Sequence, residues 1–338
     1  MEINKENTAI IISANIKDLG YRWLALRELI YFYRENYDIF IALLLRGVDL
    51  DFDNVDLKIN KEYRECFTKE KDWNYLIDKI PESIQYVFFS DADCIEVKGQ
   101  KLLEKSIREL ENNDLDGLQC FSDILYLSEY ATHKYYENRE IINDFNHKKS
   151  ATNGGYAAGG LLLFRKDWIK KVRFIDYCWL GAGDAINMAM FIPELLDNNF
   201  TNGWNRELVN DITERIKDGV RFGGVKATMM HLFHRNQSNN FYKLRRMFYG
   251  QTARKNINLN EKVGFPNIEF TDQLPIYKKY IKKDMTIGEF IRLFHTLREN
   301  DDYKNPFFLH EDTGTVIASD TYPIKPINKN DISNQTTI

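Results

Sequence analysis

Two carboxylates one residue apart, Asp91 and Asp93, end the short apolar run Y-V-F-F-S. Such a run, rich in aromatic residues, is typical of a strand that is buried on both faces. In an extended chain residues i and i+2 project from the same face, so both carboxylates would point the same way from the carboxyl end of the strand. Neighbouring carboxylates repel unless a proton or a cation lies between them, and a hard divalent ion would suit them. The alternative is an acidic turn in which Asp91 caps the next helix.

Two histidines, His231 and His234, follow an apolar segment at 219–230 that predicts a strand. In an extended chain they would point to opposite sides, so only one would bind the same ion as the aspartates. Two carboxylates and one imidazole suit Mn²⁺ or Mg²⁺, and the imidazole favours Mn²⁺. The alternative is two ordinary histidines at the end of a strand.

A third carboxylate, Asp184, ends the sequence W-L-G-A-G-D at the start of a predicted helix. The glycines before it would let another molecule approach the backbone closely, and the helix N-terminus stabilises an anion. Such a carboxylate could act as a general base or bind an acceptor hydroxyl. The alternative is a plain N-cap aspartate.

A glycine-rich segment, N-G-G-Y-A-A-G-G, precedes the predicted strand L-L-L-F, and a basic aromatic stretch follows the histidines. The glycines indicate either a wall against a flat ligand or tight turns. They do not form a dinucleotide-binding fingerprint, because they precede the strand. The basic residues could hold a pyrophosphate or form a solvated helix face; they are Arg235, Lys243, Arg245 and Arg246.

Composition narrows the class of protein. The 338 residues carry a formal net charge of -4, which gives no reason to expect nucleic acid as a partner. No apolar run approaches the roughly 20 residues that span a bilayer, and the N-terminus lacks the features of a signal peptide. We therefore expect a cytoplasmic protein, and the sequence does not indicate its oligomeric state. The four cysteines are far apart and predict reduced core thiols; they are Cys66, Cys94, Cys120 and Cys178.

The elements that must position these residues alternate between strand and helix. Strands are expected at 8–13, 38–45, 86–90 and 115–122, and helices at 23–33, 73–80 and 100–112. This order predicts an α/β fold with a doubly wound, mostly parallel sheet. The polar segment 126–150 predicts a loop over the site, and 287–300 predicts one more helix.

Taken in order, these motifs resemble those of the GT-A class of nucleotide-sugar glycosyltransferases, over about residues 8–249. The likeness is to the family-2-like group, which includes polypeptide N-acetylgalactosaminyltransferases and β-1,4-galactosyltransferases. S-D-A-D is similar to the D-x-D motif, A-G-G-L-L-L-F-R-K-D-W to an acceptor-side motif, and W-L-G-A-G-D to W-G-G-E-N or W-G-G-E-D. H-L-F-H is similar to the late histidine motif and, with Y-K-L-R, to a bacterial and phage branch.

The resemblance implies a GT-A fold and transfer of a sugar from a nucleoside diphosphate sugar, first of all a UDP-sugar, to a carbohydrate or other hydroxyl acceptor. It implies Mn²⁺ or Mg²⁺ on Asp91, Asp93 and His231, with Asp184 as the catalytic residue. Implied donor-binding residues are Ser13, Ala14, Asn15, Lys71, Trp73, Asp91, Ala92, His234 and Arg245. Implied acceptor-binding residues are Gly159, Gly160, Trp179, Gly181 and Gly183.

Three departures from the family pattern concern the site. Ala185 follows Asp184 where inverting relatives carry a second acid, so Asp184 could instead align with the acceptor-binding acid. Arg235 replaces the glycine of the phage-like branch, and no acidic residue at 45–47 would read the base. The nucleotide and the stereochemistry therefore stay open.

The resemblance also divides the chain. Residues 1–250 would form the catalytic domain, with a donor half at 1–125 and an acceptor half at 150–250. Residues 251–322 would be a mainly helical extension and 323–338 a flexible tail. Two other functions remain: a nucleotidyltransferase acting on a sugar phosphate, and a non-catalytic module that binds a nucleotide or carbohydrate.

Overall fold

The computed structural model describes most of the chain up to residue 233 and parts of the remainder. The described residues are 3–17, 20–50, 52, 54–64, 68–155, 157–181, 183–196, 204–233, 248, 251–264, 284–302, 307–310, 315–318 and 327–328. Within this part of the chain, no helix combines the length and the apolar character needed to cross a bilayer.

The core of the molecule is a seven-stranded sheet. Its strands are, in spatial order, β10 (Phe222–Gly224), β6 (Gly117–Gln119), β9 (Leu161–Arg165), β4 (Tyr86–Ser90), β1 (Thr8–Ile16), β2 (Phe40–Gly47) and β3 (Leu57–Lys61). Strand β9 runs antiparallel to β4 and β6, and every other neighbouring pair in this sheet is parallel. The predicted α/β class with a mostly parallel sheet is confirmed.

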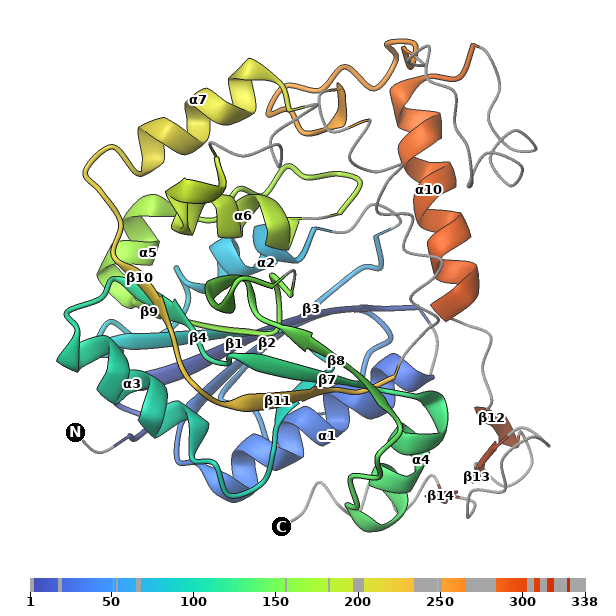
Figure 1. Ribbon diagram of the computed structural model, residues 1–338. Helices are drawn as coiled ribbons and strands as arrows, with labels where there is room; N and C mark the ends of the chain where they lie inside the picture. Colours follow the sequence, from blue (N-terminus) through green and yellow to red (C-terminus); the bar gives the residue numbers. More distant parts are fainter. Residues whose placement is uncertain are drawn as a thin grey trace.

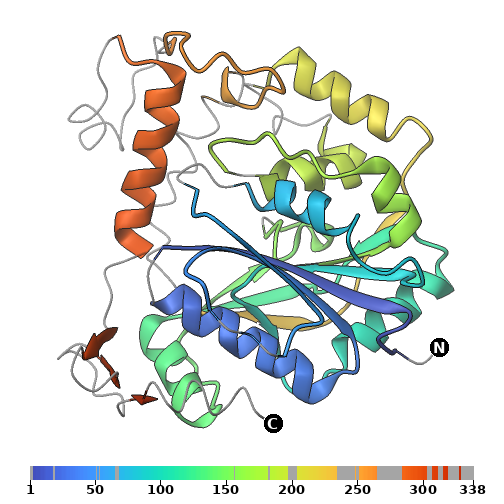
Figure 2. The same ribbon diagram turned by 180° about the vertical axis from the view of Figure 1, so that it is seen from behind.

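Helices cover both faces of this sheet, as Figures 1 and 2 show from opposite sides. On one side lie α2 (Lys69–Leu76), α5 (Lys166–Val172), α6 (Gly183–Phe191) and α7 (Arg206–Arg215), and on the other α1 (Tyr21–Asn36), α3 (Leu102–Asn112) and α4 (Glu129–Asn138). Strand β1 alternates between the two cores: Ile10 and Ile12 belong to one, Ala9 and Ile11 to the other. Burial on both faces explains why its sequence is continuously apolar.

A second, four-stranded sheet continues the first. Its order is β5 (Cys94–Glu96), β11 (Thr228–His231), β7 (Asp123–Leu127) and β8 (Phe145–Lys149). Strands β5, β7 and β11 each begin shortly after a strand of the central sheet ends: β4, β6 and β10, respectively. We call the three short gaps, residues 91–93, 120–122 and 225–227, the seam between the sheets.

The seam corrects two expectations. The segment at 219–230, predicted as one strand, is two strands in two different sheets, β10 and β11. The segment at 126–150, predicted as a loop, contains part of β7, the helix α4 and the strand β8. The segment has a polar composition typical of a loop, because β8 is largely exposed and α4 buries only a few side chains.

Beyond residue 250, the structure describes the helix α10 (Ile287–Asp302), which confirms the helix expected there. Its Phe290 and Phe294 pack in a small core that also contains Leu180. It also describes three short strands, β12 (Phe307–His310), β13 (Thr315–Ala318) and β14 (Ile327–Asn328), which the sequence does not predict. Among the described residues there are also two 3₁₀ turns, Ala151–Asn153 and Pro193–Leu195. The domain boundary at residue 250 stays a prediction.

Candidate active site

Two carboxylates from distant parts of the chain share one lysine. Asp91 follows β4, Asp184 lies in the first turn of α6, and Lys69 is the first residue of α2. The Lys69 ammonium forms ion pairs with Oδ1 of Asp91 and, at 2.5 Å, with Oδ1 of Asp184. Because all three side chains are partly exposed, this group, the Lys69 centre, is open to solvent.

Glycines shape the surroundings of this centre. The backbone N–H of Gly160 donates to Oδ2 of Asp91 at 2.8 Å, and Gly160 has a φ of +99° that L side chains rarely adopt. A Cβ at Gly159 would lie 2.6 Å from Oδ2 of Asp91 and 3.1 Å from Oδ2 of Asp184. These two glycines therefore allow the backbone to approach the carboxylates, and their predicted contact with an acceptor stays a prediction.

Glu70, which follows Lys69 in α2, is buried beside the Lys69 centre. A Cβ at Gly183 would overlap the Glu70 carboxyl group, which accounts for a glycine immediately before Asp184. Gly181, two residues earlier, has a φ of +78°, and Trp179 lies 5.9 Å from the Lys71 ammonium, measured to the ring centroid. Their assignment to an acceptor pocket is a prediction that no contact tests.

Burial and charge shift the pKa values of this centre. Burial raises the pKa of Asp91 to about 6, although the positive charge of Lys69 opposes the shift. Burial likewise raises the pKa of Glu70 to about 8. Burial lowers the pKa of Lys69, but the negative charges of Asp184 and Asp91 outweigh it and hold that pKa well above its ordinary value. Lys69 therefore stays protonated, whereas Asp91 and Glu70 gain or lose protons near neutral pH.

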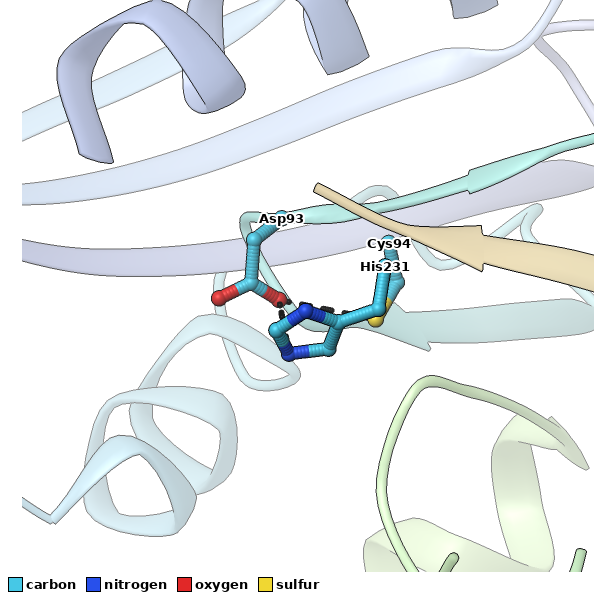
Figure 3. A group of neighbouring side chains, drawn as sticks. All are labelled: Asp93, Cys94 and His231. Atoms are coloured by element: carbon cyan, nitrogen blue, oxygen red, sulfur yellow. Dashed lines mark hydrogen bonds and ion pairs between the residues drawn. The ribbon is translucent and has the colours of Figure 1, made fainter. Parts of the chain in front are cut away.

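A second group of side chains, the Asp93 cluster, lies at the seam and is drawn in Figure 3. It consists of Asp93, Cys94 and His231, whose possible ligand atoms all lie within 4.8 Å of one another. Oδ1 of Asp93 is 3.6 Å from Nε2 of His231 and 3.5 Å from Sγ of Cys94. The cluster forms because β5 and β11 pair antiparallel, with Cys94 opposite His231.

The Asp93 cluster fits a divalent ion. Two ligand atoms that are each about 2.1–2.3 Å from one ion are about 3–3.6 Å apart at ordinary coordination angles, and the distance from Asp93 to His231 falls in that range. Carboxylate and imidazole suit Mn²⁺, whereas a thiolate would favour a softer ion. Burial raises the pKa of the Cys94 thiol well above its ordinary value, so the thiol is protonated at neutral pH.

The two aspartates of the D-x-D motif, Asp91 and Asp93, contact different residues in the structure. The expectation that both point the same way from an extended strand is wrong, because β4 ends at Ser90 and residues 92–93 form a turn at the seam. Asp91 binds Lys69 and Gly160, whereas Asp93 contacts Cys94 and His231. The charge of Asp93 still raises the pKa of Asp91, so the two groups are neighbours. Their role as metal ligands stays a prediction.

Several predicted donor-binding residues have structural partners. Ser13 donates to Asp72 at 3.0 Å, and the amide of Asn15 bonds both the N–H and the C=O of Arg64. Trp73 is buried in the core. Ala14 is buried, Ala92 is partly buried and Lys71 is exposed. His234 and Arg245 lie outside the described residues, as do Arg235, Lys243 and Arg246.

Sequence reasoning missed Lys69, Glu70 and the position of Cys94. One signal pointed to Lys69: a lysine at the first position of a helix opposes the helix dipole and so needs a local reason. Cys94 was interpreted as a core thiol; it is fully buried, and it also touches the Asp93 carboxylate.

No family model matches the chain, and no curated protein matches its sequence. Among solved structures, the chain is similar to a Drosophila β1,4-galactosyltransferase 7 in complex with manganese, UDP-Gal and xylobiose, with 16% identity, 71% of this chain and 79% of that chain covered, and a TM-score of 0.36. It is also similar to a glucosyl-3-phosphoglycerate synthase from Mycobacterium tuberculosis in complex with Mn²⁺, UDP and phosphoglyceric acid, with 10% identity, coverage of 76% and 81%, and a TM-score of 0.40.

A third similar structure is the 4-diphosphocytidyl-2C-methyl-D-erythritol synthase from Anaerococcus prevotii, with 14% identity, coverage of 65% and 89%, and a TM-score of 0.33. These scores are too low for the activity of any one of these proteins to be transferred to this chain.

Proposed function

We propose that this chain is a metal-dependent GT-A glycosyltransferase that moves a sugar from a nucleoside diphosphate sugar, first of all a UDP-sugar, to a hydroxyl acceptor. One observation carries the proposal. Asp91, from the end of a parallel strand, and Asp184, from the start of α6, meet on the same Lys69 ammonium. In open α/β sheets, ligands bind beyond the carboxyl ends of the strands, which is where this centre lies.

Asp184 is the residue best placed to take a proton from an acceptor hydroxyl. Its Oδ1 binds Lys69, and among the described residues its Oδ2 has no hydrogen-bond donor. About a third of its side chain is exposed, 35%, so an acceptor can reach it from solvent. A carboxylate that is held on one oxygen and open on the other fits a general base.

Lys69 is the candidate for stabilising negative charge in the reaction. Its ammonium stays protonated, because Asp184 and Asp91 raise its pKa. A fixed cation beside the reacting groups stabilises charge that develops on a departing diphosphate. Asp91 accepts hydrogen bonds from Lys69 and from the Gly160 N–H, and so fixes the lysine beside the end of β4.

The Asp93 cluster is the candidate for holding a divalent ion. Asp93 and His231 would bind Mn²⁺ or Mg²⁺, which would neutralise charge on the diphosphate of the donor. Asp93 lies two residues after Asp91, and its charge acts on Asp91, so donor phosphates could contact both groups.

A thermal-shift experiment on the full chain tests the proposal. UDP-, GDP- and CMP-sugars are compared with and without Mn²⁺, and release of free nucleoside diphosphate is then measured with the stabilising donor. We expect stabilisation that needs both the ion and one nucleotide, followed by slow nucleotide release that an acceptor accelerates.

Other outcomes would identify the alternative functions. Stabilisation without any release of nucleotide would indicate a binding module. Release of pyrophosphate from a nucleoside triphosphate and a sugar phosphate would indicate a nucleotidyltransferase. Either result overturns the proposed transfer.

A further inference from the structure

A groove of about 650 Å³ lies beside the outer face of α2. Lys71, Asn74 and Tyr75 of α2 line it, whereas Lys69 and Glu70 belong to the Lys69 centre. Lys69, Asp91 and Asp184, which make up the Lys69 centre, do not line the groove. The other walls come from β2, from the end of β3 and the residues after it, from the segment 171–176 and from α7.

The groove is strongly basic although the chain is slightly acidic. Seven of its lining residues are lysine or arginine and three are aspartate, a formal net charge of +4. The whole chain has a formal net charge of -4. Basic side chains are therefore concentrated in this groove, which attracts anions.

Four of the seven cations already have a carboxylate partner within the protein. The pairs are Arg46 with Asp72 at 2.6 Å, Arg173 with Asp78 at 2.6 Å, Lys171 with Asp218 at 2.8 Å, and Arg215 with Asp211 at 3.1 Å. The third aspartate of the groove, Asp176, accepts a hydrogen bond from Asn74 at 3.2 Å. These pairs build the walls of the groove.

Three cations remain for a ligand: Lys61, Arg64 and Lys71. Within the described part of the chain none of them forms an ion pair with a carboxylate. The Lys61 ammonium lies 3.6 Å from the centroid of the Tyr75 ring, and the Arg64 guanidinium makes no described contact. Arg64 and Lys71 are exposed, and Lys61 is partly buried.

Buried side chains hold the backbone next to these cations in place through hydrogen bonds. The buried Asn15 side chain donates to the C=O of Arg64 at 2.8 Å and accepts from its N–H at 3.1 Å. Arg46, itself 3% exposed, donates to the C=O of Glu62 at 3.4 Å while it is paired with Asp72. Such anchoring lowers the entropy lost when a ligand orders the groove.

We infer that this groove binds a ligand that carries phosphate groups, through Lys61, Arg64 and Lys71. Phosphate fits because an arginine guanidinium and lysine ammonium groups donate several charge-assisted hydrogen bonds to its oxygens. The volume is in the range of sites for small ligands such as a nucleotide or a sugar phosphate. The inference concerns a site outside the Lys69 centre and does not depend on the proposed transfer.

Titration of the full chain with inorganic pyrophosphate, in EDTA to exclude divalent ions, tests the inference. The double variant Lys61→Gln/Arg64→Gln should weaken pyrophosphate binding at least tenfold, because it removes two of the three available charges. The control is Lys105→Gln, an exposed lysine of α3 on the opposite face of the central sheet, which should leave binding unchanged. Both variants should unfold at the temperature of the wild type.

Three results would overturn the inference. They are no binding of pyrophosphate to the wild type at millimolar concentration, equal binding by the double variant, and an equal loss in the control variant, which would indicate a general charge effect. Saturation with UDP and Mn²⁺ then identifies the source of the phosphate. If UDP displaces pyrophosphate, the groove takes the donor diphosphate; if both bind together, the groove takes a separate phosphate, such as one on an acceptor.

Discussion

Two groups of side chains follow the same strand, β4, and they differ in chemistry. The Lys69 centre joins two carboxylates to a lysine that belongs to the protein. The Asp93 cluster joins a carboxylate, an imidazole and a thiol, three kinds of group that could hold a metal ion. The turn at residues 92–93 sends neighbouring aspartates to these two groups. We therefore expect the two groups to stabilise negative charge differently, the Lys69 centre through a lysine of the protein and the Asp93 cluster through an ion taken from solution.

We expect substitutions in the Lys69 centre and in the Asp93 cluster to change different properties of the protein. Changes in the Lys69 centre should affect catalysis and stability without a large effect on metal affinity. Changes in the Asp93 cluster should affect metal affinity first.

Asp184→Asn should reduce the transfer rate by about 10²–10⁴-fold, because the amide cannot accept the proton of the acceptor hydroxyl. The measurement is release of nucleoside diphosphate at saturating donor and acceptor. Mn²⁺ affinity, measured by calorimetry, should change little. The matched control is Asp167→Asn, an exposed aspartate in the first turn of α5. Full activity of the Asp184 variant would remove the assignment of the base but leave the metal site intact.

Lys69→Met should lower the free energy of unfolding by about 2–4 kcal/mol at pH 8, because it leaves the paired carboxylates in a partly buried site without their cation. Lys71→Met, two residues further along α2 and exposed, should change it by less than about 0.5 kcal/mol. The measurement is urea denaturation at a fixed EDTA concentration. Equal stability of both variants would show that Lys69 does not hold the centre together.

Asp93→Asn and His231→Gln should each weaken Mn²⁺ binding at least about tenfold, because each removes one ligand of the Asp93 cluster. Asp91→Asn should weaken it less, since the Asp91 carboxylate is bonded to Lys69 and Gly160. Calorimetric titration with Mn²⁺ separates the three variants. If Asp91→Asn weakened binding as much as Asp93→Asn, Asp91 would have to leave Lys69 to bind the ion, and the separation of the two groups would not hold.

Strands β1, β2 and β4 of the central sheet could be predicted from the sequence because they are buried on both faces and separated by helices. The run at 8–13 and the row Leu103, Ile107 and Leu110 carry that information directly, and all three of these leucine and isoleucine side chains are buried. The seam could not be predicted, since a gap of three residues between two strands resembles one continuous strand in periodicity. That gap decides where Asp91 and Asp93 point.

The residues of the candidate site could be predicted where they belong to a sequence motif. They could not be predicted where only the packing of distant elements brings them together. His231 was expected near the aspartates, and it lies 3.6 Å from Asp93. The meeting of Asp91, Asp184 and Lys69 depends on how α2 and α6 pack on the sheet, which no local pattern encodes. The same holds for Glu70, which is buried with its carboxyl group where a Cβ at residue 183 would lie.

The smallest expected effect concerns the pH dependence of stability, through Glu70. Burial raises its pKa to about 8 in the folded chain, compared with about 4.3 for an unperturbed glutamate. The folded state therefore binds a proton that the unfolded state releases, so this stabilisation is complete below about pH 4 and is lost as the pH rises through 8. Asp91, with a pKa of about 6, acts in the same direction at lower pH.

In EDTA, the free energy of unfolding of the wild type should fall between pH 5 and pH 8, and Glu70→Gln should reduce the fall by on the order of 1 kcal/mol. Glutamine keeps the shape that packs against Gly183 but carries no titrating proton. Glu207→Gln, an exposed glutamate in the first turn of α7, is the control and should follow the wild type. The measurement is urea denaturation at each pH. Parallel curves for Glu70→Gln and the wild type would show that Glu70 is ionised throughout, so that the single Lys69 ammonium would face three carboxylates.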